Sequence, residues 1–284
     1  MTSHLPVYRR SLRPVVIALT VVVALFAGVP WLEAHDFWLV PGAFPFADGA
    51  DVEVLGQTGT KFPTSTTAVP ANRVARAVII STDGAAVISD FSVRGTSLVL
   101  RSRPTTPGQR IVAADLVPRS ARQTPAAFLA YLRLEGAPDA AARIDRDGLL
   151  KGGDTLTRTD VKYAKTLVDV GARGARVYTR ESGQVLEFVP QQDAATLVAA
   201  DTLRLRLLFR GQPVSGIIVA AGRAPRDSAD KVEPDLHLAA DASGVVLLPI
   251  TMTGLWNVRA IHVLQVAPGA WETHWATLVV RVGK

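Results

Sequence analysis

The chain has 284 residues, of which 48% are hydrophobic and 20% are charged. This length and composition suit one large domain or two ordinary ones, and they exclude a disordered chain or a small cross-linked module. The sequence contains no cysteine, which excludes disulfides and thiolate ligands, so a bound metal must be held by nitrogen and oxygen donors. The net charge of +6 is scattered, whereas a nucleic-acid binder has a concentrated basic face, so no nucleic-acid partner is expected.

The first 34 residues have the pattern of a secretory signal peptide. Three arginines precede the apolar run that starts at Pro14, and Ala34 supplies the small residue at which cleavage would occur. The apolar run is shorter than the roughly 20 residues that span a bilayer comfortably. We therefore expect cleavage of residues 1–34, a periplasmic or otherwise exported location, and no transmembrane segment in the mature chain. Cleavage after Ala34 would make His35 the first residue.

From residue 36 to about 118, short runs of alternating apolar and polar residues are separated by turns. Examples are "DVEVLGQTG" and "RVARAVII", and the turn "STDGAA" follows the second run. Alternation with turns at intervals of about eight to twelve residues is typical of an antiparallel β-sandwich. We predict an N-terminal β-rich domain over residues 35–190, with a helical segment at about 121–172.

The helical segment is predicted from apolar spacing and from capping residues. In "TPAAFLAYLRLEG", Thr124 is the expected N-cap, Pro125 begins the first turn, and Gly136 ends the helix. "PDAAARIDRDG" predicts a second, short helix. "TRTDVKYAKTLVDVG" has apolar residues at helical spacing and ends at Gly171, which predicts a third helix.

After Gly171 the pattern returns to strands. "TLRLRLLF" alternates apolar residues with arginines and is followed by the turn "RGQP". "DASGVVLLPI", "GLWNVRAIHV" and "HWATLVVRV" continue the strand pattern. A C-terminal β-sandwich over residues 191–284 is predicted, similar to Ig-like or transthyretin-like modules. The fold class is therefore mainly β, with two β-sandwich units and a small helical insertion between them.

The sequence lacks the signatures of common enzyme classes. It has no G-x-S-x-G elbow, no Walker sequence, no dinucleotide-binding glycine motif and no H-E-x-x-H. We expect a protein that is not an enzyme. The side chains with candidate chemistry are the four histidines outside the leader, which are His35, His237, His262 and His274.

Three of these histidines are candidate metal ligands. If His35 is the first residue, its amine and its Nδ1 can chelate one ion, in an arrangement similar to the histidine brace of exported copper proteins. His262 and His274 lie twelve residues apart in consecutive strand segments, a spacing that a β-hairpin would bring together. Imidazole suits copper, nickel, zinc and iron. Glu272 and Asp36 are candidate oxygen donors, although ordinary solvation at the surface is the favoured role for both.

Several segments, in this order, resemble one protein family. They are "AHDFWLVP", "AFLAYLRLEG", "LEFVP", "LLFRGQPVSG" and "GLWNVRAIHV…WETHWATLVV". The succession resembles an exported family of domains of unknown function described as the periplasmic component of nickel or cobalt uptake (NikM-like). The resemblance implies metal transporter components of the inner or outer membrane as partners, and it matches His35 and His262 to histidine positions of the family. The chain departs from the family in "DLHLAADASG", which weakens a role for His237.

Two functions remain open at this stage. The first is a periplasmic, non-enzymatic binding protein for a divalent transition metal ion, nickel or cobalt with copper as an alternative, with His35, His262 and His274 as ligands. The second is a structural or adhesive β-sandwich module that binds a membrane partner or a polysaccharide without metal. A copper-dependent oxidative enzyme is a third reading. Whether the protein binds a metal ion distinguishes the first function from the second.

Overall fold

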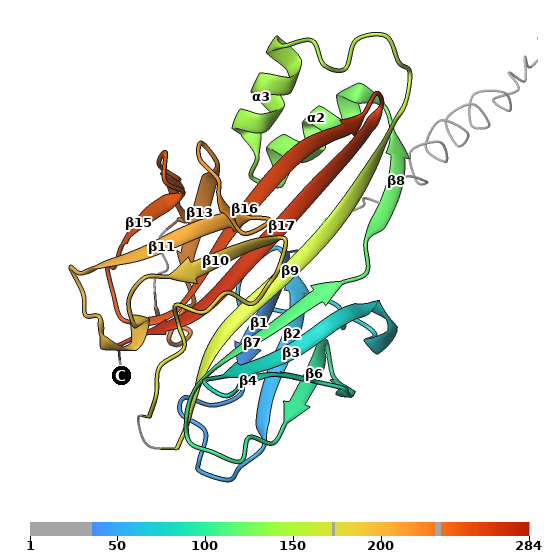
Figure 1. Cartoon of the computed structure of the whole chain (residues 1–284). Coiled ribbons are helices and arrows are strands. Elements are labelled where there is room, and N and C mark those ends of the chain that lie inside the picture. Colours follow the sequence, from blue (N-terminus) through green and yellow to red (C-terminus); the bar gives the residue numbers. More distant parts are fainter. Residues whose placement is uncertain (1–35, 172–173, 231–233, 284) are drawn as a thin grey trace, which may run out of the picture. The chain divides into compact units, whose positions relative to one another are not determined.

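The computed structural model describes residues 36–171, 174–230 and 234–283. The predicted signal peptide and His35 lie outside these residues. Residues 35–284 form one compact unit. Its described part consists mainly of β-strands in three sheets, with two α-helices (Figure 1). The predicted fold class, mainly β with two β-sandwich units, is confirmed.

A nine-stranded sheet runs through this unit and joins early and late parts of the chain. In spatial order its strands are β14 (Leu236–Ala239), β13 (Ile218–Arg223), β16 (Gly254–Ala267), β17 (Ala270–Val282), β9 (Leu156–Val170), β7 (Gly108–Leu116), β3 (Val74–Ser81) and β4 (Gly84–Val87), with β8 (Arg119–Gln123) also beside β9. Strands β17 and β9 pair in parallel. Strands from both sides of the predicted boundary after residue 190 thus share one sheet, and the boundary itself stays a prediction.

Two smaller sheets cover opposite faces of the nine-stranded sheet (Figure 1). The N-terminal sheet contains β1 (Asp36–Pro41), β2 (Val52–Gly59), β6 (Ser97–Ser102) and β5 (Asp90–Arg94). The C-terminal sheet contains β10 (Leu186–Pro190), β11 (Thr202–Phe209), β12 (Gln212–Pro213) and β15 (Val245–Pro249). On β7, Ile111 packs in the core beneath the C-terminal sheet, and the next residue, Val112, packs in the core beneath the N-terminal sheet. Because successive strand residues point to opposite faces, one sheet serves both sandwiches.

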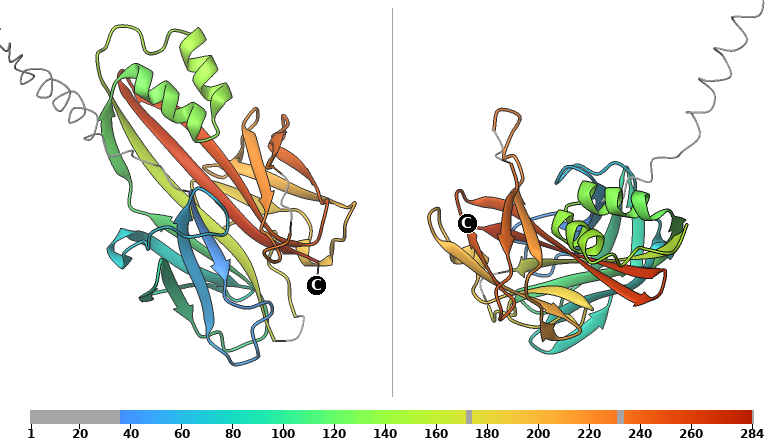
Figure 2. Two further views of the ribbon diagram at one scale, coloured as in Figure 1. Left: turned by 180° about the vertical axis from the view of Figure 1, so that it is seen from behind. Right: turned by 90° about the horizontal axis from the view of Figure 1, so that it is seen from above.

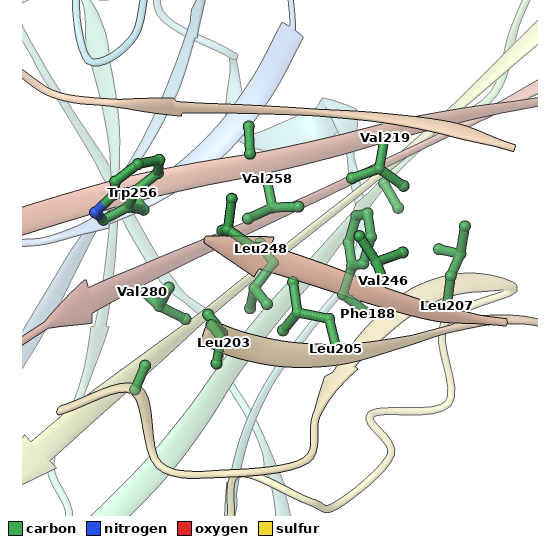
Figure 3. Packing of buried hydrophobic residues seen from close by; sticks show 14 of the residues in the cluster. Phe188, Leu203, Leu205, Leu207, Val219, Val246, Leu248, Trp256, Val258 and Val280 are labelled. Carbon is green, nitrogen blue, oxygen red and sulfur yellow. The ribbon is translucent and has the colours of Figure 1, made fainter. Parts of the chain in front are cut away.

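The core beneath the C-terminal sheet shows how the sequence pattern sets the packing. Leu203, Leu205 and Leu207 of β11 point into it, while the intervening arginines point away (Figure 3). Val258 and Val280 meet them from β16 and β17. The alternation predicted for this strand is confirmed.

Helix α2 (Pro125–Leu134) begins and ends as predicted. The Oγ1 atom of Thr124 accepts a hydrogen bond of 3.2 Å from the backbone N–H of Ala127, and Gly136 follows the helix with a φ of 93°. Helix α3 (Pro138–Arg146) comes next, and both helices lie beside the closed end of the β16–β17 hairpin (Figure 2). Phe128 of α2 packs on Trp271, with ring centroids 5.3 Å apart. Neither described helix is long and apolar enough to cross a membrane.

The prediction of a third helix within 121–172 is wrong, because "TRTDVKYAKTLVDVG" lies in strand β9. Ala164 and Val168 of β9 pack in the core beneath the N-terminal sheet, while Tyr163 and Leu167 pack in the core beneath the C-terminal sheet. A strand that is buried on both faces has apolar residues at odd and even positions. Some of those positions fall three or four residues apart, which is the spacing of a helix face.

Candidate functional site

Two of the predicted ligands meet on the β16–β17 hairpin. His262 on β16 is directly opposite His274 on β17. Residues directly opposite in an antiparallel pair project from the same face, with Cβ atoms about 4.5–5.5 Å apart. The hairpin inferred from the twelve-residue spacing is therefore confirmed, and it places the two imidazoles side by side.

The ring of His274 is held at both nitrogens. Its Nδ1 lies 3.1 Å from the hydroxyl oxygen of Tyr163, and its Nε2 lies 2.9 Å from Oε2 of Glu272. The Tyr163 and His274 rings are parallel within 3°. His274 is only 4% exposed, whereas the Glu272 side chain is 31% exposed. The site thus has a fixed imidazole inside and a carboxylate that reaches solvent.

Phe209, the last residue of β11, closes the inner side of the histidine pair. Its ring centroid is 4.6 Å from that of His262 and 5.2 Å from that of His274. The guanidinium of Arg210 lies over the Phe209 ring, 4.9 Å from its centroid. The histidine pair therefore lies at the end of the core beneath the C-terminal sheet, with an aromatic wall between it and the core.

The surroundings keep both imidazoles neutral. Burial lowers the pKa of His262 to about 4, and the nearby His274, Arg143 and Arg210 act in the same direction. Burial also lowers the pKa of His274, although Glu272 opposes this effect. Neutral imidazole is the form that can donate a lone pair to a metal ion. At pH 7 protons therefore compete only weakly with a metal ion for the lone pair of either ring.

The donor set fits a divalent transition metal ion in its chemistry. Two ligands about 2.1 Å from an ion and at right angles to each other are about 3.0 Å apart, close to the 2.9 Å between His274 Nε2 and Glu272 Oε2. An ion would replace the proton between these atoms, and the Nδ1–H of His274 would donate to Tyr163, which fixes the ring orientation. Among the described residues, no three His, Cys, Asp or Glu side chains converge as a formed metal site.

The start of the described chain lies on the other face of the nine-stranded sheet. Oδ2 of Asp36 accepts a hydrogen bond of 2.8 Å from Arg259. Arg259 lies between Val258 and Ala260, which face the same core as His262. Arg259 and Asp36 are therefore on the face opposite to His262 and His274. The structure therefore brings His262 and His274 together, while His35 lies outside the described residues and its part in the predicted three-histidine set stays a prediction.

Other residues of the site differ from the sequence interpretation. His237 lies exposed on β14, away from the pair. Tyr163 packs in the core beneath the C-terminal sheet, and its hydroxyl is hydrogen-bonded to His274. Phe209 was not singled out, because its role depends on the packing of β11 against β16 and β17. The sequence does contain one signal for a carboxylate beside His274. Glu272 lies two residues before it, and residues two apart in a strand project from the same face.

Fold and site together define a mainly β protein with two sandwiches on one sheet and a histidine pair on a hairpin. A family model described as "Domain of unknown function (DUF4198)" matches residues 32–264. The chain belongs to this family, which confirms the coarser part of the resemblance seen in the sequence. No curated protein matches the chain.

Several solved β-sandwich structures are weakly similar to the chain. The D0-D1 domain of Intimin is 15% identical, with 87% of this chain and 98% of that chain covered and a TM-score of 0.19. The Yersinia pseudotuberculosis adhesin InvE is 12% identical, with 85% and 58% covered and a TM-score of 0.21. The native form of E. coli alpha-2-macroglobulin is 10% identical, with 88% and 17% covered and a TM-score of 0.24. Likeness at this level carries no inference about function.

Proposed function

We propose that this chain is an exported, non-enzymatic binding protein that holds a divalent transition metal ion, nickel or cobalt, as cargo for an uptake system. The observation that carries the proposal is the pairing of His262 with His274 directly across the hairpin. Glu272 supplies a carboxylate beside the pair, and burial keeps both rings neutral. Nitrogen-rich sites without sulfur suit nickel and copper, so copper is the competing ion.

The position of the pair suits reversible binding. Glu272 and His262 reach solvent in part, while Tyr163 and Phe209 support the rings from within. A site at the edge of a core allows an ion to enter and leave without unfolding the sandwich. The proposed partners are therefore membrane transporter components that take the ion from this hairpin.

The proposal is tested by isothermal titration of the protein that lacks residues 1–34 with nickel, cobalt and copper salts. We expect one ion per chain, and we expect His262→Ala and His274→Ala each to weaken binding by about 10- to 100-fold or more. His237→Ala is the matched control, because His237 is an exposed histidine outside the pair. Unchanged affinity in both pair variants would reject this site, and absence of any binding would favour the metal-free structural or adhesive module.

A second titration distinguishes chelation of the ion by the terminal amine and ring of His35 from binding of the ion at the hairpin. A variant with one extra residue before His35 moves the terminal amine away from that ring. Because Asp36 lies across the sheet from the pair, we expect binding at the hairpin to be unchanged in this variant. Loss of binding would instead favour a site built on His35.

A further inference from the structure

Strand β16 is longer than its neighbour β13, so part of one edge of β16 has no strand beside it. The described pairing of β13 with β16 ends at Val219 and Ala260, whereas β16 continues to Ala267 and pairs with β17 along its other edge. In Figure 1, β16 runs past β13 toward α2 and α3. The unpaired backbone groups of such an edge are a template for another strand. Nothing in the metal-binding proposal uses this edge.

Two hydrogen bonds explain why β13 separates from β16 at this point. The backbone N–H of Gly216 donates to the carbonyl of Ala240 at 2.9 Å, and the N–H of Ala240 donates to the carbonyl of Ile217 at 3.0 Å. Gly216 has a φ of 73°, a conformation that favours glycine. The residues before β13 are therefore bonded to the segment that follows β14, on the side away from β16.

The backbone of Val263 points toward the unpaired edge. The carbonyl of Leu255 accepts a hydrogen bond of 2.8 Å from the N–H of Ala224, directly after β13, so the backbone groups of Leu255 point to the β13 side. These directions alternate along a strand, and the register of β16 with β17 is unbroken from Gly254 to Gln265. Val263 is an even number of residues beyond Leu255. Its N–H and C=O therefore also point to the β13 side, where no described strand is paired with it.

A cavity of about 720 Å³ lies along this edge. Its lining includes five consecutive residues of β16, Ile261–Gln265. A cavity over one face of a sheet would be lined by alternate residues, so this one borders the edge of the strand. The rest of the lining comes from α3 and its flanking residues, from residues 215–218 and from Trp271. Five strand residues span about 17 Å, which is the length of an ordinary strand.

The charged residues of the lining all belong to α3. They are Asp139 in its first turn and Arg143 and Arg146 in its last. Arg146 lies 3.3 Å from Asp147, whereas Arg143 has no ion pair within the described part of the chain. The charge of Arg143 also acts on His262 at the strand edge. An uncompensated positive charge beside the edge favours a bound segment that carries a carboxylate.

We propose that this edge binds an extended, acidic segment of a partner protein as an added antiparallel strand. The segment takes the line that β13 leaves, and its backbone pairs with Val263. A carboxylate of the segment lies near Arg143, and its apolar side chains contact Leu149, Ile217 and Trp271. In this mode of recognition, main-chain hydrogen bonds supply affinity and side-chain contacts supply selectivity. The inference does not depend on metal binding.

The test is isothermal titration of the protein that lacks residues 1–34, without added metal, with capped heptapeptides in which glutamate and valine alternate. We expect this acidic peptide to bind, and we expect the same peptide with lysine in place of glutamate to bind about tenfold more weakly or less. Only one of the two alternate sets of peptide nitrogens faces β16 in a paired strand. N-methylation of that set should therefore abolish binding, and N-methylation of the other set should leave it nearly unchanged.

A variant and a local probe test the geometry on the protein. Arg143→Gln should weaken binding of the acidic peptide by about two- to fivefold, the effect of one exposed ion pair. Arg119→Gln is the matched control, because Arg119 is an exposed arginine of β8 outside the cavity. The bound peptide should also slow hydrogen exchange of the Val263 amide, which measures the backbone pairing without any substitution.

Several results would overturn the proposal. They are absence of binding by the acidic peptide, equal binding of the lysine peptide, equal binding of both N-methylated peptides, and unchanged exchange at Val263. Sedimentation velocity of the protein alone covers one other occupant. A dimer in which the Val263 amide is already protected would assign the edge to a second copy of this chain, and it would likewise overturn binding of a partner segment.

Discussion

The ammonium of Lys165 lies 2.8 Å from the carboxylate of Glu187, and each side chain is only 2% exposed. Lys165 is on β9 of the nine-stranded sheet and Glu187 is on β10 of the C-terminal sheet. Glu187 also accepts hydrogen bonds from the backbone N–H and the hydroxyl of Ser182. Burial alone raises the pKa of Glu187, but the charge and hydrogen bond of Lys165 together with Ser182 hold it below its ordinary value. This ion pair joins two sheets across a dry core.

Removing one partner of this pair should destabilise the fold strongly. Glu187→Leu leaves the Lys165 ammonium buried without a counter-charge, and we expect a loss of about 3–5 kcal/mol in the free energy of unfolding. Urea denaturation followed by circular dichroism measures it. The double variant Lys165→Met with Glu187→Leu is the control and should recover much of the loss. A single variant as stable as the wild type would show that the pair contributes nothing.

The stability of the fold should fall in mild acid because of His262. Its pKa is about 4 in the folded chain against 6.5 for an unperturbed histidine. The unfolded chain therefore takes up the proton first, and folding is penalised as the pH falls from about 6.5 to 4. A pKa change of this size corresponds to about 3.4 kcal/mol, and partial exposure of the His262 ring to solvent reduces this to about 2–3 kcal/mol. Denaturation at several pH values should show a shallower decline for His262→Gln, and an identical decline in both proteins would contradict this assignment.

Metal binding should resist acid more than an ordinary histidine site does. Because burial lowers the pKa of both His262 and His274, protons displace the ion at a lower pH than at a site with unperturbed imidazoles. We expect the nickel dissociation constant to change little between about pH 7 and 6, where a site with unperturbed imidazoles already weakens. Titrations across this range measure the profile. A tenfold loss per pH unit from pH 7 downward would show rings that titrate normally.

Helix α2 is held to the β16–β17 hairpin by Phe128. Phe128 is fully buried, and its ring packs against Trp271. Phe128→Ala should cost about 3–5 kcal/mol, the usual loss for a large aromatic residue in a core. Thermal denaturation should show a lower Tm, while Leu134→Ala at an exposed position of the same helix serves as the control. Equal effects of the two changes would mean that α2 is not anchored at this contact.

The proposed export makes a direct prediction about the amino terminus of the mature protein. We expect its mass to correspond to a chain that begins at His35, since Ala34 provides the small residue that signal peptidase requires. Mass spectrometry of the protein recovered from the periplasm measures this. A mass that retains the leader, or a cut farther upstream, would leave the His35 amine in a peptide bond and end its use as a chelating group.

The sequence predicted many elements because their local signals are strong. Thr124 and Gly136 delimit α2 by capping, and the alternation of leucines and arginines sets the faces of β11. Part of the candidate site could be predicted from the sequence, because the spacing of His262 and His274 is that of facing positions in a hairpin. Strand β9 was missed because a strand with cores on both faces shows no alternation. Phe209 could not be found, because its contact with the histidines joins residues distant in the chain.

By itself, the sequence determined the mainly β character, the capped helix, the absence of cysteine ligands and the hairpin that carries two histidines. These properties follow from composition and from signals a few residues long. Only the tertiary structure decided that one sheet serves both sandwiches and that Asp36 lies across it from His262 and His274. It also decided that β13 ends beside β16 and leaves a cavity along the edge of β16. Sheet pairing and packing set these relationships between distant segments, and no local pattern encodes which face of a shared sheet a neighbouring segment will cover.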